Sequence, residues 1–483
     1  MDSTATLSAE SVVDLPVADT FGLFGSGRCE AWLFDARCER VAAGSVVRMR
    51  LPIGGDDRRS GRHGVELLGR ISAVRPHSRI VVEHDQPWRG RIRLAFDADG
   101  ARRTRVRVRA DVTASGIDWL IRRGGVALPD PAPSDALRIG LLTTKSGPGA
   151  VYASATQYLA ELAVAEVEAL GGVGGRRLEL LVADDATDPA LAAVEGARLV
   201  RAGCRAIFAC TTSSSFDALR HAVRADDVLL VHSVINEGGA AHKASVVRFG
   251  ERPRAQVAAL ARPLMRAAGG RRWFLVGQRY SWSFGAHHAA HRVLDGVGGT
   301  VVGQACVPLG TTEFAGVVER VAASGADIVM SSLVGADEVA FQRQCAAAGL
   351  RASTKALSLV MDESTWEHIG AAAAEGVVTA LGYFQDDPAA GNADLLRRYR
   401  DRFGPWAPPI SSLSETVYEA VLRYARAVRH DPDADAAHQG RALVAPGGSR
   451  AVIGERDLLG QHLYLAEAGP DGLRVVDEAA EVT

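Results

Sequence analysis

The stretch from Leu137 to Asp185 restricts the fold of this chain more than any other. It begins with an apolar run at 137–143, which is short enough for a buried strand, and continues through a turn-forming loop. An Ala-rich helical pattern then runs from about Tyr152 to Leu170 and stops at the Gly-rich break 171–175. The chain extends again at 178–185. This order predicts a βαβ unit, and such units build parallel sheets that bind ligands beyond the carboxyl ends of their strands.

The same alternation of strands and helices continues along the chain. Apolar runs typical of buried strands are found at 204–210, 228–231, 273–276, 327–330 and 356–359. Helical patterns are found at 217–224, 256–268 and 338–348. One sheet of ordinary size needs fewer units, so we expect an α/β fold with two lobes over residues 137–483. We place lobe 1 at about 137–252 and 384–445, and lobe 2 at about 253–383 and 446–483.

Residues 1–128 have a different pattern, that of an antiparallel meander followed by a short helix at 118–123. Strand signals are found at 45–51, 66–71, 79–84, 90–96 and 104–110. The aromatic residues that could lie between the sheet and the helix either fill a core or line an apolar ligand site; they are Trp32, Trp88, Phe96 and Trp119. Alternating prolines at 129–136 predict an extended linker between two parts that fold separately.

The amino-terminal part resembles the START-like, polyketide-cyclase-like (SRPBCC) helix-grip superfamily. The resemblance rests on the run from Gly69 to Pro76 leading into 80–83, on the strand at 104–109 and on the closing helix. It implies an α+β helix-grip domain over residues 1–128. Members of that superfamily often close their cavity with a long carboxyl-terminal helix, whereas the helix at 118–123 is short.

Composition indicates a globular chain, with 47% hydrophobic residues and a net charge of −2. Neither value suggests a nucleic-acid surface. The chain has no apolar run of about 18 residues, so we expect no membrane insertion. Glu10 and Asp14 interrupt the amino terminus, which predicts no secretory signal peptide and a cytoplasmic location. The six cysteines show no CxxC spacing, so we predict neither disulfides nor a zinc site.

Thr211, Thr212, Ser213, Ser214 and Ser215 form a run of hydroxyl residues between a predicted strand and a predicted helix. One such side chain is enough to cap a helix. Further hydroxyls beside the unpaired N–H groups of a helix amino terminus suit a carboxylate or an amide oxygen. We therefore expect Thr211, Ser213 and Ser214 to contact a ligand.

Residues 137–483 resemble type I periplasmic-binding-protein folds, in the branch of branched-chain amino-acid, urea and short-chain-amide receptors of ABC transporters. The segments that carry the resemblance are 171–176, 184–189, 210–215, 237–238, 277–282, 331–335 and 375–376. The resemblance implies two lobes that close on a small ligand.

The resemblance also implies roles for individual residues. Ser213 matches the hydroxyl that grips ligand, and Thr211 stands where amide receptors tend to have Tyr. His232 and Val234 fall in a second ligand loop, where an aromatic residue and Thr are more usual, while Tyr280 and Trp282 match aromatic wall positions of the opposite lobe. The residues at 211 and 234 make acetamide or urea a poor fit and favour a larger or more apolar ligand.

Motifs for catalysis or metal binding do not emerge from the sequence. The chain has no GxSxG, HExxH or P-loop motif, and its Gly-rich break follows a helix, which a dinucleotide fingerprint does not. His287 and His291 have the spacing of two metal ligands but no third, so we interpret them as a solvated helix face. We expect no cofactor, no metal and no enzymatic activity in this chain.

Three functions fit these observations. The first is a cytoplasmic sensor that binds an amide, urea-like compound or amino acid by lobe closure and signals to a regulatory partner. The second is the solute-binding component of an ABC importer, which requires export and a transporter partner. The third places a cyclase-like or lipid-binding activity in residues 1–128, which requires an accessible cavity lined by polar side chains.

Overall fold

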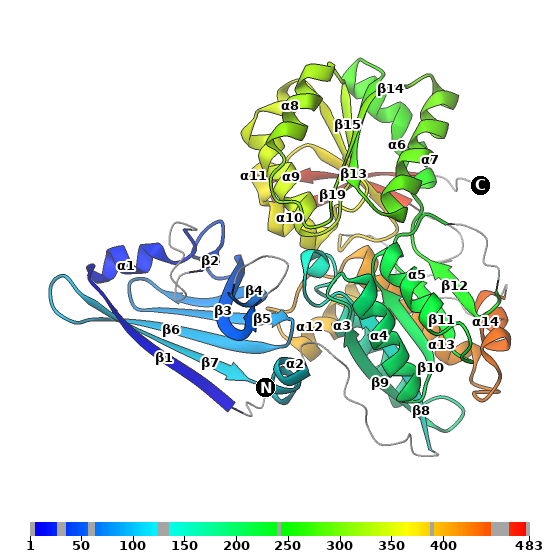
Figure 1. The fold of residues 1–483 in the computed structure, drawn as a ribbon, viewed down its shortest axis with the longest axis horizontal. Helices are drawn as coiled ribbons and strands as arrows, with labels where there is room; N and C mark the ends of the chain where they lie inside the picture. Colours follow the sequence, from blue (N-terminus) through cyan, green and yellow to red (C-terminus); the bar gives the residue numbers. More distant parts are fainter. Residues whose placement is uncertain are drawn as a thin grey trace. The chain divides into compact units, whose positions relative to one another are not determined.

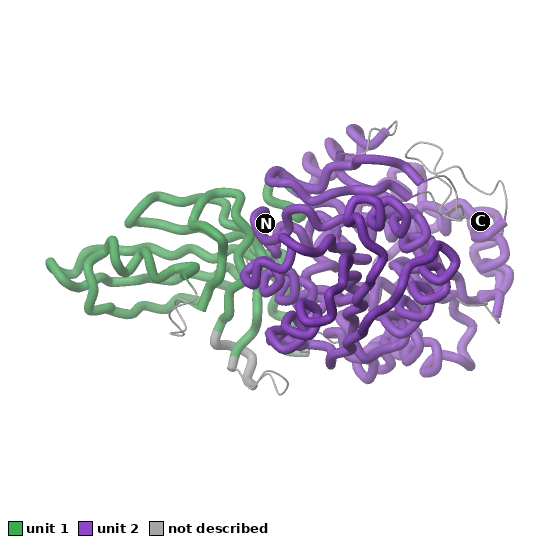
Figure 2. The backbone as a smooth tube through the Cα atoms, turned by 90° about the horizontal axis from the view of Figure 1, so that it is seen from above, with its two compact units in different colours: residues 1–127, 404–408 green, residues 128–403, 409–483 purple. Residues whose placement is uncertain are grey.

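The computed structural model describes residues 5–26, 35–56, 63–122, 135–238, 243–386, 391–445 and 463–479. The chain divides into two compact units, residues 1–127 with 404–408 and residues 128–403 with 409–483 (Figure 2). Most of the predicted Pro-rich linker, residues 129–134, lies outside the described residues, as do Trp32 and residues 446–462 of the predicted lobe 2.

The first unit is built on a seven-stranded antiparallel sheet with the order β1-β7-β6-β5-β4-β3-β2. The strands are β1 (Ala5–Val13), β2 (Ala36–Arg37), β3 (Val46–Asp56), β4 (His63–Arg75), β5 (Arg79–Gln86), β6 (Gly90–Ala98) and β7 (Thr104–Val112). Helix α1 (Val17–Leu23) follows β1, and α2 (Ala114–Arg122) follows β7. The predicted meander corresponds to β3–β7, whereas β1, α1 and β2 were not predicted.

One face of this sheet carries an apolar core. Strand β7 alternates buried and more exposed residues, so that Val106, Val108 and Ala110 point inward while its arginines point outward. Trp88 and Phe96 belong to the same core cluster, and Trp119 of α2 packs against it with its ring 5.2 Å from that of Trp88. The described aromatic residues therefore contribute to packing.

Lobe 1 of the second unit is built on a parallel sheet with the order β12-β11-β10-β8-β9. Its strands are β8 (Ala136–Thr143), β9 (Arg177–Asp184), β10 (Cys204–Cys210), β11 (Leu229–Ser233) and β12 (Val246–Phe249). All eight residues of β8 are buried, as expected for a central parallel strand covered on both faces. Helices α4 and α5 lie on one face of the sheet, and α3, α13 and α14 lie on the other (Figure 1).

Lobe 2 is built on a seven-stranded sheet with the order β14-β13-β15-β16-β17-β18-β19, in which β18 and β19 are antiparallel to their neighbours. Its strands are β13 (Arg272–Gln278), β14 (Thr300–Val307), β15 (Ile328–Ser332), β16 (Lys355–Ser358), β17 (Val377–Leu381), β18 (Leu463–Gly469) and β19 (Gly472–Ala479). The chain thus returns to lobe 2 at its carboxyl-terminal end, where β19 is seen in Figure 1. Strand β18 pairs there with β17.

The helices of lobe 1 are α3 (Thr156–Ala169), α4 (Pro189–Arg201), α5 (Ser213–Ala222), α12 (Asn392–Phe403), α13 (Ser412–Ala427) and α14 (Ala436–Val444). Those of lobe 2 are α6 (Pro253–Ala268), α7 (Ser281–Val297), α8 (Ala315–Ser324), α9 (Ala336–Ala347), α10 (Glu363–Ile369) and α11 (Ala371–Ala374). Short 3-10 helices are found at Pro148–Val151 (η1) and Leu350–Ala352 (η2). Among the described residues, no helix combines the length and apolar character needed to cross a membrane.

The Gly-rich break after α3 is a tight turn that brings the chain into β9. Val173 and Arg176 exchange backbone hydrogen bonds of 2.9 and 3.0 Å across it. Gly172 has a φ of 75°, and a Cβ there would lie 2.1 Å from the carbonyl oxygen of Arg176. Gly171 also has a positive φ, 94°, but a Cβ there would meet no atom within 4 Å. Glycine is favoured at both positions because φ is positive. At Gly172 the absence of a Cβ also makes room for the Arg176 carbonyl oxygen.

We predict that Gly172→Ala destabilises the protein by about 2–4 kcal/mol, because it combines left-handed strain with a backbone clash. Gly171→Ala is the matched control and should cost about 1 kcal/mol, since it has only the strain. Urea unfolding of the two variants checks the prediction. Equal midpoints would show that the clash is relieved by a small movement of the turn.

Candidate functional site

The order of strands in lobe 1 creates a switch point between β8 and β10. The chain leaves β8 for β9 on one side of the sheet and then crosses to β10 on the other side. In open α/β sheets, ligands bind beyond the carboxyl ends of the strands at such a point. Here those ends are Thr143 and Cys210, and the loops that follow them are 144–147 and 211–212.

The predicted hydroxyl run lies at the amino terminus of α5. Thr212 caps the helix, and its Oγ1 accepts a hydrogen bond from the Ser215 N–H at 3.3 Å. Ser213 donates its hydroxyl to Glu237 Oε2 at 2.5 Å, while Ser214 is half-buried. The cap therefore uses one hydroxyl of the run, and Ser213 is paired with a carboxylate from the loop after β11.

His232 and Val234 lie inside lobe 1 beside this loop, and both are buried. The His232 Nε2 is 3.1 Å from the Thr211 carbonyl oxygen, and its ring stacks on Phe216 at 4.2 Å. Burial lowers the pKa of His232 to about 4, so the ring is neutral at pH 7. In this position His232 supports the loop that begins with Thr211, whose own side chain is also buried.

Strand β9 ends at the carboxyl group of Asp184 and is followed by that of Asp185. Asp184 accepts the backbone N–H groups of Lys145 and Ser146 through Oδ1 and so anchors the loop after β8. Asp185 is fully buried, and its Oδ1 accepts hydrogen bonds from Thr144 Oγ1 at 2.8 Å and from the Thr187 N–H at 3.0 Å. Burial raises the pKa of Asp185 to about 6. Its Oδ2 has no hydrogen-bond partner among the described residues.

Lobe 2 has its own switch point, between β13 and β15. Gln278, at the end of β13, donates to Asp337 Oδ2 at 2.7 Å and accepts the Val334 N–H at 3.2 Å. Tyr280 and Trp282 follow, with ring centroids 6.2 Å apart. Trp282 is buried and Tyr280 half-buried.

The loop after β16 supplies another buried carboxyl group. Asp362 caps α10, because its Oδ1 accepts the Thr365 N–H at 2.8 Å. Its Oδ2, like that of Asp185, has no hydrogen-bond partner in the part of the chain that the structure describes. Burial raises the pKa of Asp362 to about 6.

Electrostatic interactions link these groups to the Cys210 thiol. Burial, together with the charges of Asp185 and Asp362, raises the pKa of the Cys210 thiol to about 12. Burial and the neighbouring Asp185, Cys210 and Tyr280 raise the pKa of Tyr152 well above its usual value. We call this set the interlobe cluster: Tyr152, Asp185 and Cys210 of lobe 1, and Tyr280 and Asp362 of lobe 2.

The hydroxyl run adjoins the interlobe cluster through Glu237. Burial, then the charges of Glu237 and Asp337, raise the pKa of Tyr280 well above its usual value. Glu237 is also the partner of Ser213, and a Cβ on Gly285 of α7 would lie 2.7 Å from its Cβ. Ser213 and Tyr280, predicted from the sequence on opposite lobes, therefore share one neighbour.

Two further contacts bring the lobes together. Ser154 and Ser364 share a hydrogen bond of 2.7 Å between their hydroxyls. Gly335, before α9, has a φ of 60°, and a Cβ there would lie 2.1 Å from the carbonyl oxygen of Pro148 in η1. The lobes are thus in direct backbone contact beside the interlobe cluster.

Glu251 joins two of the crossings between the lobes. It lies on the crossing from β12 to α6, and its Oε1 accepts the N–H of Gly382, which lies on the crossing that follows β17, at 2.6 Å. The same oxygen accepts a hydrogen bond from Ser412 at the start of α13.

The two histidines of α7 differ in environment. His291 is exposed, as predicted, but His287 is buried, with its Nδ1 3.9 Å from Cys306 Sγ. The interpretation of both as a solvated face is therefore wrong for His287, because the β13–β14 pair covers that side of the helix. Across the described ranges, no group of three or more His, Cys, Asp or Glu side chains is placed to hold a metal ion.

Sequence reasoning missed much of the interlobe cluster and its neighbour Glu237. The residues it did not select are Tyr152, Asp185, Cys210, Glu237 and Asp362. A signal for two of them is present, since Asp185 and Asp362 each follow an apolar run that ends a strand or lies just beyond one.

Comparison with known proteins gives both a family and a fold. The model of the family described as "Periplasmic binding protein" matches residues 136–467. The substrate-binding protein of an amino-acid ABC transporter from Pseudomonas fluorescens is 19% identical, with a TM-score of 0.62 over 73% of this chain and 97% of that chain.

Two further solved structures are similar to a comparable degree. A solute-binding protein of an ABC transporter from Rhodopseudomonas palustris, in complex with 4-hydroxybenzoate, has 20% identity and a TM-score of 0.63 over 72% of this chain and 98% of that chain. A branched-chain amino-acid transporter substrate-binding protein from Streptococcus pneumoniae, in complex with isoleucine, has 17% identity and a TM-score of 0.62 over 71% and 99%.

The family match corrects one expectation from the sequence. The predicted cytoplasmic location is wrong, because the matching family is that of periplasmic binding proteins. The inference failed because it rested on the residues at the amino terminus alone, which carry no information about the family of residues 136–467. The sheets of two lobes and the match over more than half of its residues show that this chain belongs to the periplasmic binding protein family.

Proposed function

We propose that the protein is the solute-binding component of an ABC importer and that its ligand is an amino acid held between the lobes. The observation that carries this proposal is the pair of buried carboxyl groups, Asp185 and Asp362, which come from opposite lobes and each have one oxygen without a hydrogen-bond partner among the described residues. A buried carboxylate without a cation is costly. A ligand ammonium group would supply that cation.

The hydroxyl run supports recognition of the other end of an amino acid. The Ser213 and Ser214 hydroxyls lie at the amino terminus of α5, where backbone N–H groups and the helix dipole favour a carboxylate. Ser213 now donates to Glu237, and it can turn toward a ligand carboxylate when one is present. The ammonium group of the amino acid would thus be bound by Asp185 and Asp362, and its carboxylate by the amino terminus of α5.

An aromatic acid is the second candidate, and the aromatic side chains favour it. Tyr152, Tyr280 and Trp282 could flank a ring, and one similar structure holds 4-hydroxybenzoate. Such a ligand has no cation for Asp185 and Asp362, so both would have to bind a proton. We therefore expect an aromatic acid to bind below pH 6 and an amino acid to bind above it.

A thermal-shift screen of the full chain at pH 7.5 and at pH 5 tests the proposal, with aliphatic and aromatic amino acids, benzoates, short-chain amides and urea. A ligand at 100 times its dissociation constant adds about 2.7 kcal/mol to the free energy of unfolding. We expect an amino acid to raise the melting temperature and Ser213→Ala to weaken its binding about tenfold. The matched control is Ser324→Ala on α8, which should bind normally. Stabilisation by benzoates and by no amino acid would contradict the main proposal.

For the first unit we propose a START-like helix-grip fold. What supports it is the strand order β1-β7-β6-β5-β4-β3-β2, with α1 between β1 and β2 and α2 after β7. A cyclase-like activity would need polar side chains in an accessible cavity, and the buried polar side chains that the structure describes in β5 are His84 and Gln86.

A further inference from the structure

Lobe 1 has a pocket far from the carboxyl ends of its strands. A cavity of about 280 Å³ lies between the last turn of α5, the chain leading into β11, and β12. Its apolar floor is formed by the buried side chains Val223, Val228, Leu230 and Val246. Because α5 starts at the interlobe cluster and ends here, the pocket is a separate site at the opposite end of that helix.

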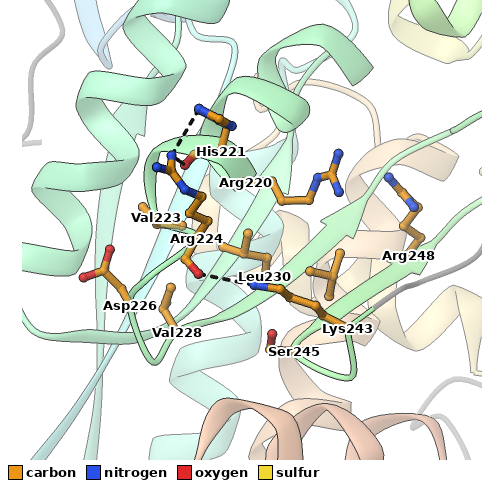
Figure 3. A pocket seen from close by; sticks show the side chains of 11 residues that line it. Arg220, His221, Val223, Arg224, Asp226, Val228, Leu230, Lys243, Ser245 and Arg248 are labelled. Carbon is orange, nitrogen blue, oxygen red and sulfur yellow. Dashed lines mark hydrogen bonds between the residues drawn. The ribbon is translucent and has the colours of Figure 1, made fainter.

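Basic side chains surround this apolar floor (Figure 3). They are Arg220, His221, Arg224, Lys243 and Arg248, and Asp226 is the acidic residue of the lining. Arg220 pairs with Asp217 at 3.1 Å. Arg224 instead donates to the His221 carbonyl oxygen, and Lys243 donates to that of Arg224 at 3.3 Å. Among the described residues, Arg224, Lys243 and Arg248 therefore have no carboxylate partner.

The dipole of helix α5 explains only some of the basic side chains around the pocket. Cations are favourable in the last turn of a helix, which explains Arg220 and His221 at the end of α5. Lys243 and Arg248 come from the segment before β12 and from β12 itself. Arg248 is held in place by Phe216, with its guanidinium 5.6 Å from the ring centroid. Basic side chains from α5, from the segment before β12 and from β12 thus line the same cavity.

We propose that this pocket binds a small organic anion with a doubly charged head, a phosphate monoester or a dicarboxylate, and a compact apolar part. The unpaired guanidinium and ammonium groups match such a head, since arginine binds phosphate and carboxylate through paired hydrogen bonds. The apolar floor matches the other part of the ligand. A cavity of this size is at the lower end of those that hold small molecules.

Calorimetric titration of the full chain with phenyl phosphate and with phthalate tests the proposal. We expect saturable binding of at least one of them with one site per chain. Arg224→Ala with Lys243→Ala should weaken it at least tenfold; both side chains are exposed, so the variant should fold. Arg262→Ala with Arg292→Ala is the matched control, because it removes the same charge from exposed positions on α6 and α7 and should bind normally.

Equal loss of anion binding in both double variants would overturn the proposal, because it would show that binding depends only on the net charge of the protein and not on this pocket. Absence of saturable binding to wild type would also overturn it and would leave an acidic partner protein as the occupant. Asp185→Asn must retain anion binding, since Asp185 belongs to the interlobe cluster. Loss of binding in that variant would place the anion between the lobes and contradict a separate site.

Discussion

At pH 7.5, Asp185→Asn is expected to be more stable than wild type by about 2–3 kcal/mol and to bind its amino acid at least tenfold more weakly. The substitution keeps the shape of the side chain. The amide oxygen of the variant can still accept from Thr144 and from the Thr187 N–H, and its NH₂ group takes the place of Oδ2, which has no hydrogen-bond partner among the described residues. The substitution removes the negative charge and keeps the two hydrogen bonds to Oδ1.

The sign of the stability change follows from the pKa. Burial raises the pKa of Asp185 from 3.8 to about 6, so the folded protein binds more protons than the unfolded chain between those values. The free energy of unfolding therefore falls as the pH rises through this range, and above pH 6 the whole cost of the buried charge is present. Urea unfolding at pH 5 and pH 7.5 should show a smaller loss in the variant than in wild type.

Ligand affinity should have the opposite dependence on pH. An ammonium group binds the ionised carboxyl, so below pH 6 a proton must leave first, and the affinity of wild type should fall up to about tenfold per pH unit. In Asp185→Asn this dependence should be reduced. Glu338→Gln is the control, because Glu338 is a buried carboxyl group with a raised pKa that lies on α9, outside the interlobe cluster. It should change stability and leave affinity unchanged; equal loss of affinity would contradict the assignment.

Gly335→Ala is expected to weaken ligand binding about tenfold to a hundredfold while each lobe stays folded. The residue has φ 60° and ψ −130°, a region that only glycine adopts readily. Its new Cβ would lie 2.1 Å from the Pro148 carbonyl oxygen of the other lobe. Because backbone cannot give way as a side chain can, the lobes must separate at this point, which opposes closure on a ligand.

The control for this prediction is Gly349→Ala, also in lobe 2. Gly349 has a φ of 66°, and a Cβ there would meet no atom within 4 Å. It should cost about 1 kcal/mol of stability and leave affinity unchanged. Titration calorimetry with the ligand found in the screen measures both variants, and small-angle scattering measures their compaction on binding. Wild-type affinity in Gly335→Ala would show that the contact does not resist closure.

Local pattern was sufficient to predict most of the parallel strands of the two lobes, although β12, β14 and β17 were not predicted. The run from Cys204 to Cys210 is apolar throughout except for Arg205, and its predicted bounds are those of β10. Strand β1 was not predicted, because Ala5–Val13 has a weak alternation and gains its structure by pairing along its whole length with β7, about 100 residues away. The β18–β19 hairpin was missed for the same reason, since its partner in the sheet is β17.

The candidate site was predicted only in part because it depends on contacts between segments distant in sequence. The hydroxyl run from Thr211 to Ser215 is continuous, so a sequence pattern can reveal it. Asp185 and Asp362 are ordinary residues when taken singly, and what distinguishes them is that both are buried and that the charge of each raises the pKa of the same Cys210 thiol. These residues of different lobes are brought into one site by the way the chain crosses between the lobes. A local sequence pattern does not specify those crossings.

The Glu251 carboxylate limits the number of independent motions that the lobes can make. If the crossings were independent, one lobe could both bend and twist against the other. Here Glu251, on one crossing, accepts hydrogen bonds from Gly382, on another crossing, and from Ser412. The two crossings must therefore move together. We expect the open protein to sample fewer arrangements as a result, so that less conformational entropy is lost when a solute closes the lobes. Glu251 would thereby strengthen binding without contacting the ligand.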